Sequence, residues 1–138
     1  MTKSEELLSY AERKGYRTVC TELPETKSLS LEDGSCYYIG LDTKLTSAEK
    51  TVCLAHELGH CDYDGFYHSN SPCETMERME RRARKHSYLM LVPVDEIQSA
   101  ISNGVVEVWD LAEHFGVTYE FMQSAIEYYR NALGVEFM

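Results

Sequence analysis

The stretch CLAHELGHCDYD, residues 53–64, carries His56 and His60 four residues apart, with Glu57 directly after the first. If this stretch is helical, residues four apart lie one turn above each other, so both imidazoles can face one metal ion. Glu57 then lies to the side of that pair, where its carboxylate can reach a water molecule beside the ion. The spacing therefore predicts an HExxH metal centre for Zn²⁺, with Glu57 as the general base of a hydrolytic reaction.

A catalytic zinc ion needs a third protein ligand and an open position for water. The extended pattern has a glycine three residues and a histidine six residues after the second histidine. Tyr63 and Phe66 stand at those positions, so this variant is excluded. The remaining donors follow within twenty residues of His60: Asp62, Asp64, His68, Glu74, Glu77 and Glu80.

The segment that follows Ser71 helps to choose among these donors, because it predicts a second helix. At about 100° per residue, its apolar side chains share one arc, namely those of Met76, Met79, Ala83, Met90 and Leu91. Glu80 lies inside this arc, whereas Glu77 and Glu74 lie towards solvent. A carboxylate among apolar neighbours must be paired or bind a metal, so Glu80 is the favoured ligand. Glu77 and His68 remain alternatives, and an ion pair with Arg84 is the alternative role for Glu80.

The elements that must position these residues have clear boundaries. A first helix is predicted from a cap at Ser4 to Gly15. Residues 16–23 predict a strand, residues 24–35 a loop or hairpin, and residues 36–42 a second strand rich in tyrosine.

Two longer helices follow the strands. Thr46, with Glu49 three residues on, predicts a capping box, so the HExxH residues should lie on a helix. The second helix is expected to have Ser71 as its N-cap and Pro72 in its first turn, and to stop at Pro93.

Residues 93–138 predict a helical C-terminal part. A short helix ends at Asn103-Gly104, and two further helices meet at a helix-turn-helix-like corner around Gly116. The second helix of the corner offers Glu120, Gln123 and Glu127 but only Arg130 as a cation, which favours a packing corner over a DNA reader.

The composition indicates the broad class of protein. The 138 residues are 43% hydrophobic and 26% charged, which predicts one globular domain over residues 1–138. The net charge of −10 argues against direct nucleic-acid binding. Five cysteines without CxxC spacing are interpreted as reduced thiols. No apolar run is long enough for a membrane span, and the polar N-terminus does not resemble a signal peptide, so a cytoplasmic location is expected.

Four segments resemble the ImmA/IrrE-type zinc metallopeptidases of bacteria, phages and integrative elements: AEKTVCLAHELGHC, GFY, ERRARKHSYLMLVP and EVWDLAEHFGVTYEFM. In that family a helix of pattern E-x-x-A-N/D-x-F/W-A follows the HExxH helix, and its glutamate is the third zinc ligand. That position falls on Glu80, and the alanine falls on Ala83. The family's Asn or Asp falls on Arg84, its aromatic residue on His86 and its next alanine on Ser87.

The resemblance implies an α+β, zincin-like fold, with a small N-terminal sheet packed on the HExxH helix and a mainly helical C-terminal half. It also implies an endopeptidase that uses Zn²⁺ held by His56, His60 and Glu80 to cleave a protein, plausibly a helix-turn-helix repressor. Tyr67 and His68 are candidates for an oxyanion or substrate contact. Arg84 keeps open the alternative of a weak or inactive enzyme that acts as a protein-binding module.

Overall fold

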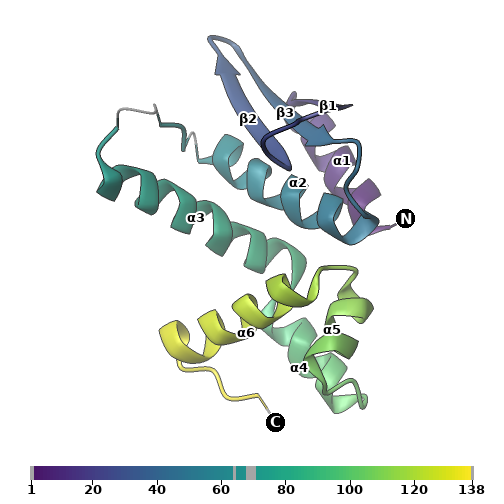
Figure 1. Ribbon diagram of the computed structural model, residues 1–138. Coiled ribbons are helices and arrows are strands. Elements are labelled where there is room, and N and C mark those ends of the chain that lie inside the picture. Colours follow the sequence, from purple (N-terminus) through teal and green to yellow (C-terminus); the bar gives the residue numbers. More distant parts are fainter. Residues whose placement is uncertain (1, 64, 68–70, 138) are drawn as a thin grey trace.

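The computed structural model describes residues 2–63, 65–67 and 71–137 (Figure 1). These residues form an α+β fold, as the sequence predicts. In chain order its elements are α1 (Lys3–Lys14), β1 (Arg17–Thr21), β2 (Ser28–Asp33), β3 (Cys36–Asp42), α2 (Ser47–Asp62), α3 (Cys73–Leu91), α4 (Val94–Ser102), α5 (Val108–Phe115) and α6 (Tyr119–Leu133).

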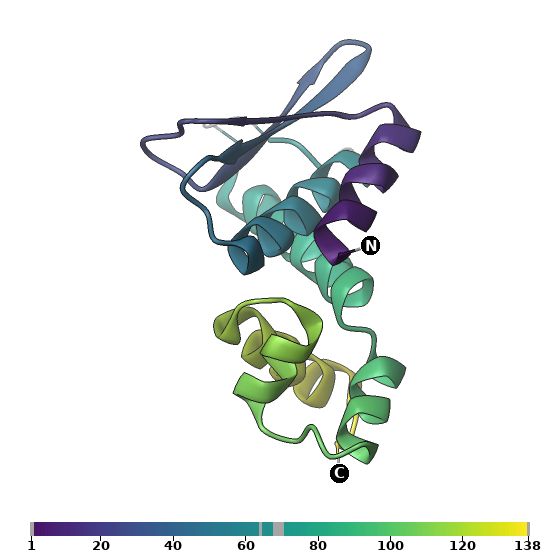
Figure 2. The same ribbon diagram turned by 90° about the vertical axis from the view of Figure 1, so that its right-hand side faces the viewer.

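The sheet is small and has the strand order β1-β3-β2. β1 runs parallel to β3, and β2 runs antiparallel to it, so β2 is an edge strand. One face of the sheet packs on α1 and α2, as Figure 2 shows. Ile39 and Leu41 of β3 are fully buried on that face, whereas Val19 and Leu31 are exposed. The predicted packing of a small sheet on the HExxH helix is confirmed.

Helices α2 and α3 lie side by side beneath the sheet (Figure 1). The predicted capping box starts α2: Thr46 Oγ1 accepts from the Glu49 amide, and Glu49 accepts from the Thr46 amide. Gly59 lets the two helices approach closely. A Cβ atom at this glycine would lie 2.9 Å from Ala83 Cα and 3.0 Å from its carbonyl oxygen. A side chain at residue 59 would therefore force α3 away from α2.

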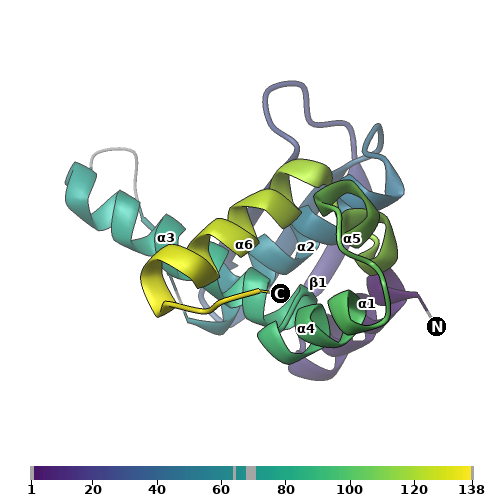
Figure 3. The same ribbon diagram turned by 90° about the horizontal axis from the view of Figure 1, so that it is seen from below.

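The C-terminal helices α4–α6 form the lower part of the molecule (Figure 1, and from below Figure 3). Gly116 adopts a φ of 69° between α5 and α6, and Thr118 caps α6 by accepting from the Phe121 amide. The buried Tyr129 hydroxyl donates to the Val92 carbonyl at 2.9 Å, which ties α6 to the end of α3. No helix among the described residues is both long and apolar enough to cross a membrane.

Two boundaries differ from the sequence prediction. The cap of α1 is Thr2 and not Ser4, because the Thr2 side chain accepts from the Glu5 amide. The N-cap of α3 is Pro72 and not Ser71, and it makes no side-chain cap bond. The predicted loop or hairpin over residues 24–35 proves to be a hairpin, because residues 28–33 form β2 and pair with β3 across the turn at residues 34–35.

Candidate metal centre

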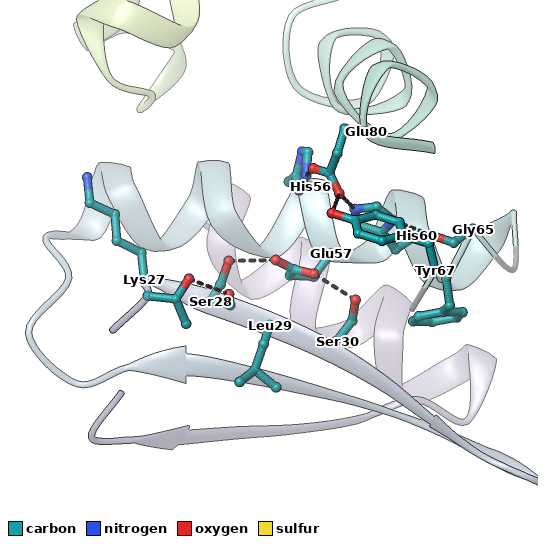
Figure 4. Close-up of a pocket in the computed structure, with 12 residues that line it drawn as sticks. Lys27, Ser28, Leu29, Ser30, His56, Glu57, His60, Gly65, Tyr67 and Glu80 are labelled. Carbon is teal, nitrogen blue, oxygen red and sulfur yellow. Dashed lines mark hydrogen bonds and ion pairs between the residues drawn. The ribbon is translucent and has the colours of Figure 1, made fainter. Parts of the chain in front are cut away.

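His56 and His60 of α2 meet Glu80 of α3 at one point of the molecule (Figure 4). His56 Nε2 lies 2.9 Å from Glu80 Oε1, and His60 Nε2 lies 2.9 Å from Glu80 Oε2. The three donor atoms that these side chains offer lie within 4.8 Å of one another. The structure thus brings together the three residues that the sequence favours as ligands.

The second ring nitrogen fixes the orientation of His60. Its Nδ1 donates to the Gly65 carbonyl at 2.6 Å, which turns Nε2 towards Glu80. This backbone contact is the kind of outer partner that orients metal-binding histidines. Burial lowers the pKa of His60, but its hydrogen bonds to Glu80 and Gly65 outweigh that effect and leave the pKa raised.

Glu80 has three hydrogen-bond donors around its carboxylate. Its bonds with His56 and His60 hold its pKa far below the ordinary value, against the opposing effect of burial. Tyr67 adds a third bond, because its hydroxyl donates to Oε2 at 2.9 Å. Tyr67, a candidate substrate contact from the sequence, thus lies beside the ligand cluster with its hydroxyl aimed at it.

The other predicted donors divide into two groups. Asp62 faces away from the cluster, and Glu74 and Glu77 are exposed on α3, where Glu77 lies 4.0 Å from Arg81. Asp64 and His68, which the sequence also puts forward, lie outside the described residues.

Arg84 does not draw Glu80 away from the cluster. Within the described part of the chain no ion pair joins the two side chains, and Arg84 is exposed. The alternative role of Glu80 as an ion-pair partner of Arg84 is therefore wrong. The cation at this family position faces a different cavity, described below.

Glu57 lies on the sheet side of α2, next to the ligand cluster, and is only 6% exposed. Ser28 Oγ donates to its Oε2, and Ser30 Oγ donates to its Oε1, each at 2.7 Å (Figure 4). Both oxygens of this buried carboxylate are thus satisfied by one strand, which fixes the plane of the group.

The sequence prediction does not include these two serines, because it gives residues 24–35 as a loop or hairpin without assigning which side chains face the HExxH helix. The signal that could have identified them is the alternation in Ser28-Leu29-Ser30-Leu31. Period-2 alternation predicts a strand with both hydroxyls on one face.

A cavity of about 570 Å³ joins these parts into one site. Its walls are the ligand cluster, Glu57, the residues after α2, and the edge strand, and they include Lys27, Leu29, Gly65, Phe66 and Tyr67. Residues 28–30 of the edge strand β2 therefore border the same space as the candidate metal ligands.

Asp62 instead anchors the N-terminal helix. Its carboxylate accepts from the Tyr10 hydroxyl at 2.7 Å and from the Tyr16 hydroxyl at 2.6 Å, and His86 Nε2 lies 3.0 Å away. Burial and the bond to Asp62 raise the pKa of Tyr10 to about 12. This partly buried network joins α1, α2 and α3.

The donor set fits zinc. Two imidazole nitrogens and one carboxylate are the ligands of a known class of catalytic zinc site, which keeps a fourth position for water. The carboxylate balances half of the ion's charge, and the Gly65 contact supplies the orientation that such a site needs.

Comparison with protein-family models matches residues 11–127 to the IrrE N-terminal-like domain, a peptidase family. No curated protein matches the chain.

Proposed function

Because the chain belongs to the IrrE N-terminal-like peptidase family, we propose that it is a zinc-dependent endopeptidase that hydrolyses a peptide bond in a protein substrate. The observation that carries this proposal is the meeting of His56, His60 and Glu80 beside Glu57 in one cavity. A metallopeptidase-type activity is what the family implies, and the identity of the metal is part of the proposal.

His56, His60 and Glu80 would hold the zinc ion, which supplies Lewis-acid chemistry when it is bound. Glu57 takes a proton from the attacking water as the oxygen of that water bonds to the scissile carbonyl carbon. Glu57 then passes that proton to the amide nitrogen as the carbon–nitrogen bond breaks. The serines keep the carboxylate in place for both transfers. The Tyr67 hydroxyl, which donates to Glu80 beside the site, is the donor we propose for the oxygen of the former carbonyl.

Strand β2 supports the binding of an extended peptide. It is an edge strand, and residues 27–30 line the cavity that holds Glu57. An extended segment can pair with such an edge through main-chain hydrogen bonds, which places a peptide bond in reach of the site.

A helix-turn-helix repressor of a phage or mobile element is the substrate we propose. The resemblance to ImmA/IrrE-type enzymes suggests it, and the net charge of −10 suits a basic, DNA-binding partner better than DNA itself. A repressor acts where the chromosome is, which agrees with the cytoplasmic location expected from the sequence.

The test is a comparison of the protein with Glu57→Gln, each loaded with one zinc equivalent. Their substrate is a library of peptides made from a digested bacterial proteome, and new termini are identified by mass spectrometry. We expect the unchanged protein to cleave and the variant to keep its zinc without cleaving. Cleavage by Glu57→Gln at an unchanged rate would contradict the role of Glu57.

Arg84 and the acidic surface motivate the alternative of a zinc-binding protein that only binds a partner. The argument from Arg84 is weakened, because Glu80 pairs with His56 and His60 and not with Arg84. The same experiment separates the two functions: a binding module would show no new termini with either protein, although both would contain zinc.

A further inference from the structure

A second cavity, of about 330 Å³, opens beside the candidate metal centre and is called the side pocket here. Its lining includes Ser28 and His56, which also line the larger cavity. The side pocket thus adjoins the site and shares two wall residues with it, a candidate zinc ligand and a serine that binds Glu57.

Four elements build the side pocket. Helix α2 contributes Val52 and Cys53, α3 contributes Tyr88, the first turn of α6 contributes Phe121, and strand β2 contributes Ser28. The first turn of α6 lies close to α2 and α3 in both Figure 1 and Figure 3. The predicted helix-turn-helix-like corner therefore forms one wall of a pocket beside the metal centre.

The inner surface is apolar and the rim is charged. Tyr88 and Phe121 are buried to 7% and 8% exposure, and Val52 and Cys53 are half-buried. Exposed Arg84 and Glu120 line the opening with opposite charges. Such a pocket accepts an uncharged, apolar side chain, because a charged one would lose its hydration against the aromatic rings without gaining a buried partner.

We propose that the side pocket is a specificity subsite that receives a large apolar side chain, such as leucine or phenylalanine, from a substrate residue flanking the scissile bond. This inference rests on the proposed peptidase function. In this inference α6, which carries none of the candidate metal ligands, contacts the substrate side chain and so contributes to substrate specificity. Arg84, which stands where the family has Asn or Asp, lies at the rim of this subsite.

Ser124 offers a way to fill the pocket without changing a ligand. It is exposed on α6 and lines the pocket together with Tyr88. Ser124→Phe adds a ring at this position. Ser124→Ala removes the same hydroxyl without filling space. Gln123→Phe adds the ring to the neighbouring exposed residue, which does not line the pocket.

The first measurement needs no hydrolysis. The protein, with and without zinc, is titrated with N-acetyl-leucine methylamide while the valine methyl signals are followed by NMR. We expect the Val52 methyl signals to shift in the unchanged protein, Ser124→Ala and Gln123→Phe, and not in Ser124→Phe. Val52 signals that stay in place in the unchanged protein, or that move equally in Ser124→Phe, would overturn the proposal.

The second measurement is the cleavage profile of the four proteins on the peptide library. We expect a preference for leucine or phenylalanine over glycine of about tenfold or more at one position next to the cut, lost only in Ser124→Phe. A profile that Ser124→Phe leaves unchanged would overturn the subsite. Val52 shifts without any cleavage would instead uphold the pocket and contradict the peptidase function, so the two failures are distinguishable.

Discussion

The hydroxyl of Ser30 donates a hydrogen bond of 2.7 Å to Oε1 of Glu57, and so joins the edge strand β2 to the HExxH helix. Ser28 holds the other carboxylate oxygen at the same distance. A general base must be held in a productive position to transfer a proton efficiently. We infer that the strand that borders the substrate cavity also positions the base.

Replacing both serines with alanine should lower kcat by about 10- to 100-fold, because a freed carboxylate spends less time in the reactive position. KM and zinc content should stay near those of the unchanged protein. The measurement is steady-state cleavage of one peptide identified in the library.

Threonine restores the hydroxyl, so Ser30→Thr should recover most of the rate that Ser30→Ala loses. Ser35→Ala is the matched control, since Ser35 lies in the exposed turn after β2. Equal losses in the Ser30 and Ser35 variants would point to a general effect on the sheet and against positioning.

Glu80→Ala should bind zinc much more weakly than the unchanged protein. Loss of a residue that only orients a ligand lowers metal affinity by roughly 10- to 100-fold, and loss of the ligand itself should lower it further. Metal content and affinity are measured by elemental mass spectrometry and competition with a chelator. Glu77→Ala is the control, because Glu77 is an exposed glutamate one turn earlier on α3. If Glu77→Ala loses zinc and Glu80→Ala keeps it, the assignment of the third ligand is wrong.

Gly59→Ala should destabilise the fold by about 1–3 kcal/mol, because the new Cβ would lie 2.9 Å from Ala83 Cα. Any relief by separating α2 from α3 would also pull Glu80 away from the histidines, so zinc affinity should fall too. Denaturant unfolding and zinc titration measure the two effects.

The clash involves the backbone of Ala83, so adding Ala83→Gly should not rescue Gly59→Ala. Recovery of stability in the double variant would show that the limiting contact is the Ala83 methyl group, and that the backbone of α3 does not clash with a Cβ atom at residue 59.

Tyr129→Phe should lower the free energy of unfolding by about 1 kcal/mol near neutral pH, since the Val92 carbonyl loses its donor. Burial raises the pKa of Tyr129 from 10.0 to about 12. The unfolded chain therefore releases this proton first, so the stability contribution is intact below pH 10 and is lost as pH rises towards 12.

Unfolding in denaturant at a series of alkaline pH values should thus show a steeper loss of stability for the unchanged protein than for Tyr129→Phe. Tyr10, whose pKa is also about 12, leaves part of the slope in both proteins. Parallel curves would mean that Tyr129 titrates alike in the folded and unfolded states.

The parts of the site that the sequence predicts are those set by short spacings. The capping box of Thr46 and the spacing of His56 and His60 are signals within one helix, and both are confirmed as geometry. The arc of apolar residues on α3 selects Glu80 for the same reason, because helical periodicity alone places it beside buried neighbours.

The parts that were not predicted depend on contacts between distant segments. Glu57 and Ser28 are 29 residues apart, and Asp62 and Tyr10 are 52 apart. No local pattern states which strand faces a helix or which tyrosine reaches a carboxylate. The expected Ser71 cap failed for a different reason: Pro72 itself takes the cap position, so α3 starts one residue later than the pattern suggests.

The two hydrogen bonds of Asp62 bear on the order in which the chain folds. They span 52 and 46 residues, so the contacts of α1 and of Tyr16 just after it close the longest loops in this half of the molecule. The β2–β3 hairpin and the α2–α3 pair close shorter ones. Because long loops cost more entropy before their contacts form, we expect α1 to dock last. The cavity at the candidate metal centre would then form before α1 is docked. Changes at Tyr10 would therefore speed unfolding far more than they slow folding.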